Sequence, residues 1–132
     1  MMLRQVNLFF TRTYNMNRIL KIEEFAQFVL GIALFSQLSY VWWWFPALLL
    51  VPDIGMLGYL INPRLGAITY NVFHHKGIAI GILLAGMFLF GDLCTLIGVI
   101  LFSHSAMDRM FGYGLKYPDS FQNTHLGTIG KK

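Results

Sequence analysis

The chain has 132 residues, of which 56% are hydrophobic and only 12% are charged. Soluble domains carry about 25% charged residues, so this composition excludes an ordinary soluble domain and favours several membrane-spanning helices. The net charge of +4 does not indicate a nucleic-acid partner, because no basic stretch is interleaved with aromatic residues, and the single cysteine, Cys94, excludes an intrachain disulfide or a cysteine-based metal site.

The chain begins with a basic stretch, residues 1–16, which we expect to be an N-terminal extension or an interfacial arm. Met16 is a second plausible start, and Asn17 is suited to cap a helix that begins there. Residues 17–112 form the predicted transmembrane domain. Its four apolar segments are 22–40, 41–61, 77–90 and 93–110. The connections between them are short, so neighbouring helices run antiparallel, which predicts an all-α four-helix bundle.

The third segment leaves two alternatives open. Residues 77–90 are fewer than the roughly 20 that a hydrocarbon core needs. Either residues 64–76 continue the same helix, or they form a separate segment at the cytoplasmic face. Gly77, which follows two histidines and a lysine, suits a break. After the fourth segment, residues 113–132 have no apolar period and are expected to be a non-helical cytoplasmic tail.

The basic residues predict the orientation. All ten lysines and arginines lie on one side of a four-span arrangement, and the positive-inside rule places that side, with both termini, in the cytoplasm. The cluster from Trp42 to Trp44 then lies at the outer interface, where indoles are favoured. We therefore expect a multi-pass protein of the bacterial cytoplasmic membrane whose main partner is the lipid bilayer. The sequence leaves open whether it forms a homo-oligomer.

Ionisable residues occur at depths where they are costly. Asp53 follows Trp42 by eleven residues, which places it roughly 16 Å deep in a continuous helix. His104 lies roughly 18 Å from the outer edge by the same arithmetic, and Asp108 is one helical turn further on the same face. Such residues face the bundle interior and mark functional sites more often than not. We expect Asp53, His104 and Asp108 to be catalytic.

A second pair of polar residues is expected at a similar depth in the membrane. Asn71 and His74 share a helical face, and His74 lies roughly 25 Å from the outer edge, near Asp108. Two imidazoles with two carboxylates form a familiar donor set for Zn²⁺, Mn²⁺ or Fe²⁺. The predicted metal ligands are therefore Asp53, His74, His104 and Asp108. A purely structural hydrogen-bonded network is the alternative.

The predicted substrate-binding residues surround this cluster. Arg109 points to a different face from Asp108 and either contacts lipid phosphates or grips an anionic substrate. The tail either ends irregularly or folds over the cavity mouth with Tyr113, Lys116 and His125. With Asn71, these four residues complete the predicted substrate site.

Two stretches carry a recognisable pattern: "PDIGMLGYLINPRLGAITYNVFHH" and "SHSAMDRMFGYGLKYPDSFQNTHLG". Here the sequence resembles a bacterial family known as domain of unknown function 4260, over roughly residues 18–130. The resemblance implies a small membrane protein and brings no activity with it. A weaker similarity, resting on residue types alone, is to small membrane-bound metal-dependent hydrolases.

These observations favour metal-assisted hydrolysis of a lipid-borne or amphiphilic substrate from the cytoplasmic side. Metal would lower the pKa of a bound water and polarise the substrate. One alternative is a small proton, ion or solute transporter, since buried Asp and His residues also form proton relays; four spans leave little room for a pathway unless the protein oligomerises. Another is a non-catalytic membrane module in which the polar residues only fix the helix register.

Overall fold

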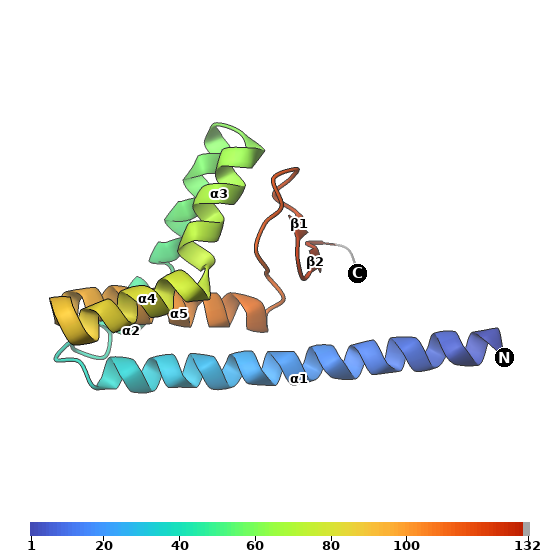
Figure 1. The fold of residues 1–132 in the computed structure, drawn as a ribbon, viewed down its shortest axis with the longest axis horizontal. Coiled ribbons are helices and arrows are strands. Elements are labelled where there is room, and N and C mark those ends of the chain that lie inside the picture. Colours follow the sequence, from blue (N-terminus) through green and yellow to red (C-terminus); the bar gives the residue numbers. More distant parts are fainter. Residues whose placement is uncertain (131–132) are drawn as a thin grey trace.

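The computed structural model describes residues 1–130, and almost all of its regular structure is helical (Figure 1). The prediction of an all-α protein is therefore confirmed. Three helices, α1 (Met2–Ser36), α4 (Lys76–Ala85) and α5 (Asp92–Met110), lie alongside one another, and a pair of helical segments projects away from them.

Helix α1 is continuous over its whole length. It passes through Met16 and Asn17 without interruption, so the prediction that Asn17 caps a new helix is wrong. The buried residues of α1, Gly31 and Phe35, are both near its C-terminal end, and the N-terminal part extends beyond the rest of the molecule (Figure 1). A side chain at position 31 would collide with Ser103, so this glycine lets α1 and α5 pack closely.

The second apolar segment is not a single helix. It consists of the short α2 (Trp44–Leu49) and the 3-10 helix η1 (Val51–Leu60). Pro52 lies at the start of η1 and has no N–H to donate to the preceding turn, which favours an interruption there. The assumption of one continuous helix over residues 41–61 is therefore wrong, and the segment beyond Pro52 takes a new direction.

The third segment is also broken. Helix α3 (Pro63–His74) is followed by His75 in an extended conformation and then by α4, which continues into the π-helical turn η2 (Gly86–Phe90). The chain bends by 46° at this break. Residues 64–74 therefore belong to a separate helix, and the break falls at His75 rather than at Gly77. The side chain of Asn62 caps α3 by accepting from Leu65 N, and that of His75 caps α4 by accepting from Ile78 N.

The core lies between α5 and its neighbours. Gly91, with φ of 87°, allows the tight turn from η2 into α5. A side chain at Gly98 would collide with Leu83, so α4 and α5 pack with their backbones close together. The main apolar cluster contains Phe35, Phe45, Leu83, Leu96, Val99 and Ile100.

The tail folds back onto the helices. Strands β1 (Asn123–Thr124) and β2 (Gly127–Thr128) form a small antiparallel hairpin, and Lys116 pairs with Thr124 beside it. The tail is thus non-helical, as its lack of an apolar period indicated.

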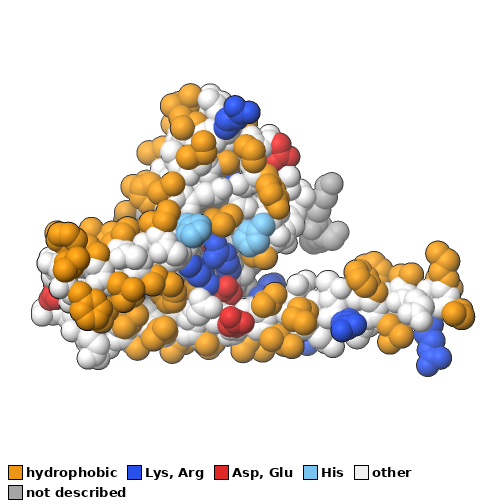
Figure 2. Space-filling view, in the orientation of Figure 1, with side chains coloured by type: hydrophobic (Ala, Val, Ile, Leu, Met, Phe, Trp, Pro, Cys, Tyr) orange, Lys and Arg blue, Asp and Glu red, His pale blue; other side chains and the backbone are white. Residues whose placement is uncertain are grey.

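The surface of the molecule is strongly apolar. Many large hydrophobic side chains are exposed, and Figure 2 shows them along most of the visible face. Among residues 1–130, α5 is the one helix long and apolar enough to cross a membrane, and a second crossing requires α3 and the α4–η2 segment to count as one bent span. Segments η1 and α3 lie side by side and leave the bundle together (Figure 1).

Candidate metal centre

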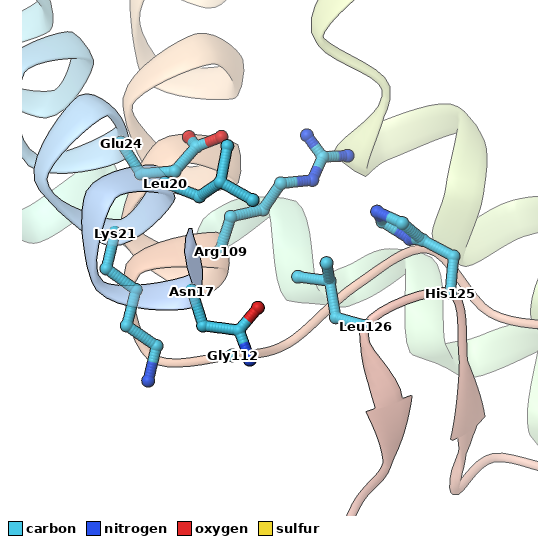
Figure 3. A pocket seen from close by; sticks show the side chains of 8 residues that line it. All are labelled: Asn17, Leu20, Lys21, Glu24, Arg109, Gly112, His125 and Leu126. Atoms are coloured by element: carbon cyan, nitrogen blue, oxygen red, sulfur yellow. The ribbon is translucent and has the colours of Figure 1, made fainter. Parts of the chain in front are cut away.

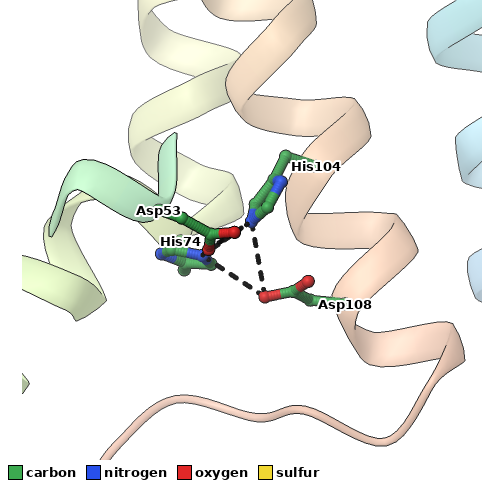
Figure 4. Close-up of side chains that lie close together, drawn as sticks. All are labelled: Asp53, His74, His104 and Asp108. Carbon is green, nitrogen blue, oxygen red and sulfur yellow. Dashed lines mark hydrogen bonds and ion pairs between the residues drawn. The ribbon is translucent and has the colours of Figure 1, made fainter. Parts of the chain in front are cut away.

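Four side chains from three separate parts of the chain converge on one point (Figure 4). One donor atom from each of Asp53, His74, His104 and Asp108 lies within 4.8 Å of all the others. The two Nε2 atoms are 2.8 Å apart. The Nε2 atom of His74 lies 3.4 Å from Asp53 Oδ1 and 3.3 Å from Asp108 Oδ2. The corresponding distances from His104 Nε2 are 3.1 and 3.5 Å. The structure thus brings together all four residues proposed as metal ligands.

The two breaks in the helices create this convergence. Asp53 lies in the first turn of η1, directly after the interruption at Pro52, and His74 is the last residue of α3, directly before the bend. Both side chains therefore face α5, which supplies His104 and Asp108 from successive turns. His104 is fully buried, whereas the Asp53 side chain is 35% exposed. The cluster is closed on the histidine side and open on the carboxylate side.

Hydrogen bonds to backbone carbonyls place a proton on Nδ1 of both imidazoles. His74 Nδ1 lies 2.8 Å from the carbonyl oxygen of Tyr70, and His104 Nδ1 lies 2.6 Å from that of Leu49. A carbonyl oxygen only accepts, so both Nδ1 atoms must donate. In the neutral rings the Nε2 atoms then carry bare lone pairs that point at one another. Two lone pairs at this separation repel unless a metal ion or a proton lies between them.

The distances between imidazole and carboxylate donors are close to those of a small tetrahedral metal site, and the distance between the two imidazoles is shorter. With bonds of about 2.0–2.1 Å, neighbouring donors of a tetrahedral centre lie about 3.3–3.4 Å apart. The five separations given above range from 2.8 to 3.5 Å. Anchoring the outer ring nitrogen of each histidine on a carbonyl is also how protein metal sites orient their ligands. The buried group can therefore hold a metal ion.

Tyr70 belongs to the same site and was not identified from the sequence. Its hydroxyl donates to Asp108 Oδ2 at 3.0 Å, and its ring stacks on His74 with centroids 3.7 Å apart. It thus orients one carboxylate and one imidazole simultaneously. Tyr70 lies one helical turn before His74, so its position on the same face was the available signal.

A pocket of about 300 Å³ opens from the carboxylate side of the cluster. Its lining includes Asp53, Asp108 and Tyr70, and the tail supplies Tyr113 and Lys116. Of the predicted substrate-binding residues, Tyr113 and Lys116 therefore lie beside the candidate metal centre. The tail covers this side of the site, in agreement with the second of the two alternatives for its conformation.

Asn71 holds the tail in place and does not line the pocket. Its side-chain amide donates to Lys116 O at 2.8 Å, and its carbonyl oxygen accepts from Lys116 N at 2.7 Å. These two bonds fasten the backbone of the tail to α3. The prediction that Asn71 contacts substrate is not supported by this position, because both of its polar atoms are occupied by the backbone of Lys116.

Arg109 and His125 lie at a different cavity, of about 370 Å³, between α1 and the tail (Figure 3). Arg109 donates to the carbonyl oxygen of His74 at 3.1 Å. His125 Nδ1 accepts from Leu115 N at 2.8 Å, and burial followed by the charge of Arg109 lowers the pKa of its imidazole. The expectation that these two residues share one substrate site with Lys116 is therefore not met.

A partly buried ion pair beside this second cavity was also missed. Lys76, at the start of α4, pairs with Glu24 of α1 and donates to Gln27 Oε1 at 2.7 Å. The pair fastens α1 to the bend that follows α3. Its partners are separated by more than fifty residues, so no local sequence pattern connects them.

Comparison with known proteins gives one match. The model of the family described as Domain of unknown function (DUF4260) matches residues 17–129, and the chain belongs to this family. No curated protein and no solved structure matches the chain.

Proposed function

We propose that this member of the DUF4260 family is a membrane-embedded, metal-dependent hydrolase that acts on a lipid-borne or amphiphilic substrate from the cytoplasmic side. One observation carries the proposal: the Nε2 atoms of two imidazoles, oriented by bonds from Nδ1 to backbone carbonyls, face each other beside two carboxylates at the edge of an open pocket. Four donor atoms turned towards one point beside a pocket are what a catalytic metal site requires.

The donor set favours Zn²⁺, with Mn²⁺ and Fe²⁺ as the other choices. Imidazole with carboxylate ligands suits all three ions. The short donor separations favour the ion that accepts four ligands at about 2.0–2.1 Å. Ca²⁺ is disfavoured, because it takes 6–8 oxygen ligands at 2.3–2.6 Å.

The chemistry follows from the open side of the site. Asp53 and Asp108 both line the pocket, so a metal held by His74, His104 and Asp108 would keep a fourth position that water can reach from there. Such a metal would lower the pKa of this water, and the remaining pocket carboxylate would take the proton as it is released. The water oxygen bonds to the electrophilic atom of the substrate, the bond to the leaving oxygen breaks, and the leaving oxygen receives the proton. Asp53, the more exposed carboxylate, is the base in this scheme.

The membrane arrangement is part of the proposal. We place four spans across the bacterial cytoplasmic membrane with both termini in the cytoplasm, because large hydrophobic side chains cover the surface and all ten basic residues fall on one side. In this arrangement α2 and α4 form the outer halves of the second and third spans. Segments η1 and α3 are the cytoplasmic halves, tilted away together, and their tilt opens the site towards the cytoplasm.

The test uses purified full-length protein with fluorogenic esters that carry a long alkyl chain, in mixed micelles. We expect turnover that a chelator abolishes and Zn²⁺ restores. The variants Asp53→Asn and His104→Gln should be inactive. His75→Asn is the matched control, because it replaces a neighbouring histidine outside the cluster and keeps a residue that can cap α4.

Turnover that persists in the chelator, or in His104→Gln, would contradict the proposal. Equal loss in His75→Asn would also contradict it, since the effect would then not be specific to the cluster.

A further inference from the structure

Lys116 is a buried cation without an anionic partner among residues 1–130. It is only 5% exposed. Its ammonium donates to the carbonyl oxygen of Phe121 at 2.9 Å and lies 3.8 Å from the Phe121 ring centroid and 4.9 Å from that of Tyr70. The carbonyl takes one of three N–H donors, so the ammonium retains donors for a ligand. Buried charges are normally paired, and this one faces a pocket instead.

The nearest negative charges lie across that pocket. Asp53, Asp108 and Lys116 all line it, yet the lysine forms an ion pair with neither carboxylate. They still influence each other: burial lowers the pKa of the Lys116 ammonium, and the charges of Asp108 and Asp53 counteract the effect. The space between the ammonium and the carboxylates is therefore where a ligand would sit.

The charges that line the pocket indicate whether the ligand is neutral or negatively charged. A divalent metal would cancel the two carboxylates, and the buried Lys116 ammonium would then leave one positive charge at the pocket. A neutral carboxylic ester would leave this charge uncompensated, which is costly. A phosphate group carries negative charge on non-bridging oxygens, so it can bind the metal through one oxygen and the ammonium through another.

We propose that the substrate is a phosphate ester, bound between the metal and the Lys116 ammonium. This assignment rests on the proposed metal-dependent hydrolase function. The water oxygen forms a bond to phosphorus, the phosphorus–oxygen bond to the alcohol breaks, and the alcohol oxygen takes the proton. The Lys116 ammonium would hold the phosphate product until it leaves. A lipid headgroup and a soluble ester share this chemistry.

Binding of inorganic phosphate to Zn²⁺-loaded protein tests the assignment by calorimetry. We expect Lys116→Met to weaken phosphate binding by about tenfold or more, since it removes a charge-assisted hydrogen bond and keeps the apolar stem. Its zinc content should stay unchanged. Lys21→Met is the matched control: it removes a lysine from the other cavity, beside Arg109 and His125, and should leave phosphate affinity unaltered.

A second measurement uses the unaltered protein, so it does not depend on how a variant folds. With Mn²⁺ in the site, the phosphorus NMR signal of phosphate should broaden strongly, because the ligand lies against a paramagnetic ion. Chelator should remove the broadening. An unbroadened signal, unchanged affinity in Lys116→Met, or loss of affinity only in Lys21→Met would overturn the assignment.

The fluorogenic esters separate the two proposals. If the protein hydrolyses phosphate esters and no acyl esters, both the hydrolase proposal and the phosphate assignment are supported. Turnover of acyl esters alone leaves the hydrolase standing and overturns the phosphate assignment, and a protein that binds no metal overturns both. Glycerol phosphate and a diacylglycerol phosphate in micelles then separate a soluble source from a lipid source, because only the lipid also contacts the apolar surface.

Discussion

At the scale of single residues, the site depends on how each imidazole is held. His74 and His104 each donate from Nδ1 to a carbonyl of the chain, so both Nε2 atoms are acceptors when the rings are neutral. Tyr70 adds a donor to Asp108 and a stacked ring on His74. These contacts set the direction of the donor atoms before any ligand binds, and such outer partners contribute to metal affinity.

Replacing Tyr70 by Phe tests this support. The ring stays on His74 while the hydrogen bond to Asp108 is lost, so we expect zinc affinity to fall about 10- to 100-fold with the fold intact. Competition with a chromogenic chelator measures the affinity. Tyr113→Phe, in the same pocket, is the control. Equal affinities for Tyr70→Phe and wild type would show that the hydroxyl does not support the metal.

A second prediction distinguishes a functional site from a structural lock. Ionisable groups packed together repel or require desolvation, so a site built for function does not favour stability. In metal-free protein, His104→Gln and Asp53→Asn should therefore keep or raise the midpoint of thermal unfolding in detergent. If the network only locks helices, each change should instead cost about 1–3 kcal/mol. Chelator-treated protein is needed because bound metal stabilises by mass action.

At the scale of elements, the irregular segments matter most. The interruption at Pro52 and the bend at His75 turn η1 and α3 away from the bundle and leave Asp53 and His74 at the point of departure. A regular four-helix bundle would place these side chains on continuous helices with no opening beside them. The pair of Lys76 with Glu24 lies at the same bend and holds α1 against it.

Removing the charge of Glu24 from the ion pair with Lys76 should destabilise the protein at the bend. Glu24→Gln takes away the charge that faces a partly buried ammonium, so we expect a loss of about 1–3 kcal/mol in the free energy of unfolding. The double variant Glu24→Leu with Lys76→Leu should recover much of it, because no unpaired charge remains. Denaturation in detergent gives both values, with Glu23→Gln as the exposed control. A double variant no more stable than Glu24→Gln would contradict this account.

The sequence predicted the cluster better than the elements that carry it. Counting residues along helices placed the four cluster residues, Asp53, His74, His104 and Asp108, at similar depths. The structure brings them together because each break in the helices lies directly beside a cluster residue, Asp53 or His74. The conformation of η1 was not predicted, since η1 packs mainly against α3, and the extended conformation of His75 was not predicted either. The separation of Arg109 and His125 from Lys116 depends on the path of the tail, which no periodic pattern encodes.

At the scale of the whole molecule, the proposed orientation rests on the distribution of charge, and the exposed apolar surface supports contact with lipid. The turn at Asp92 is free of lysine and arginine, whereas the tail carries several. In the proposed arrangement the second and third spans would reach the cytoplasmic face as tilted halves, because α3 is bent by 46° from the α4–η2 segment.

Reporter fusions test this orientation. A fusion in the turn at Asp92 should report the outer side of the membrane, and fusions at the N-terminus and after Gly130 should report the cytoplasm. A control fusion at Asn62, between η1 and α3, should also report the cytoplasm. The same location for the Asp92 and C-terminal fusions would contradict the four-span arrangement.

The most direct test of the metal centre is X-ray absorption at the zinc edge, with elemental analysis of the same full-length protein. We expect about one ion per chain, with two imidazole nitrogens and carboxylate oxygens at about 2.0–2.2 Å. His74→Gln with His104→Gln should lose the ion, and His75→Asn should keep it. A protein that takes up no divalent metal, or one whose metal survives removal of both His74 and His104, would contradict the account.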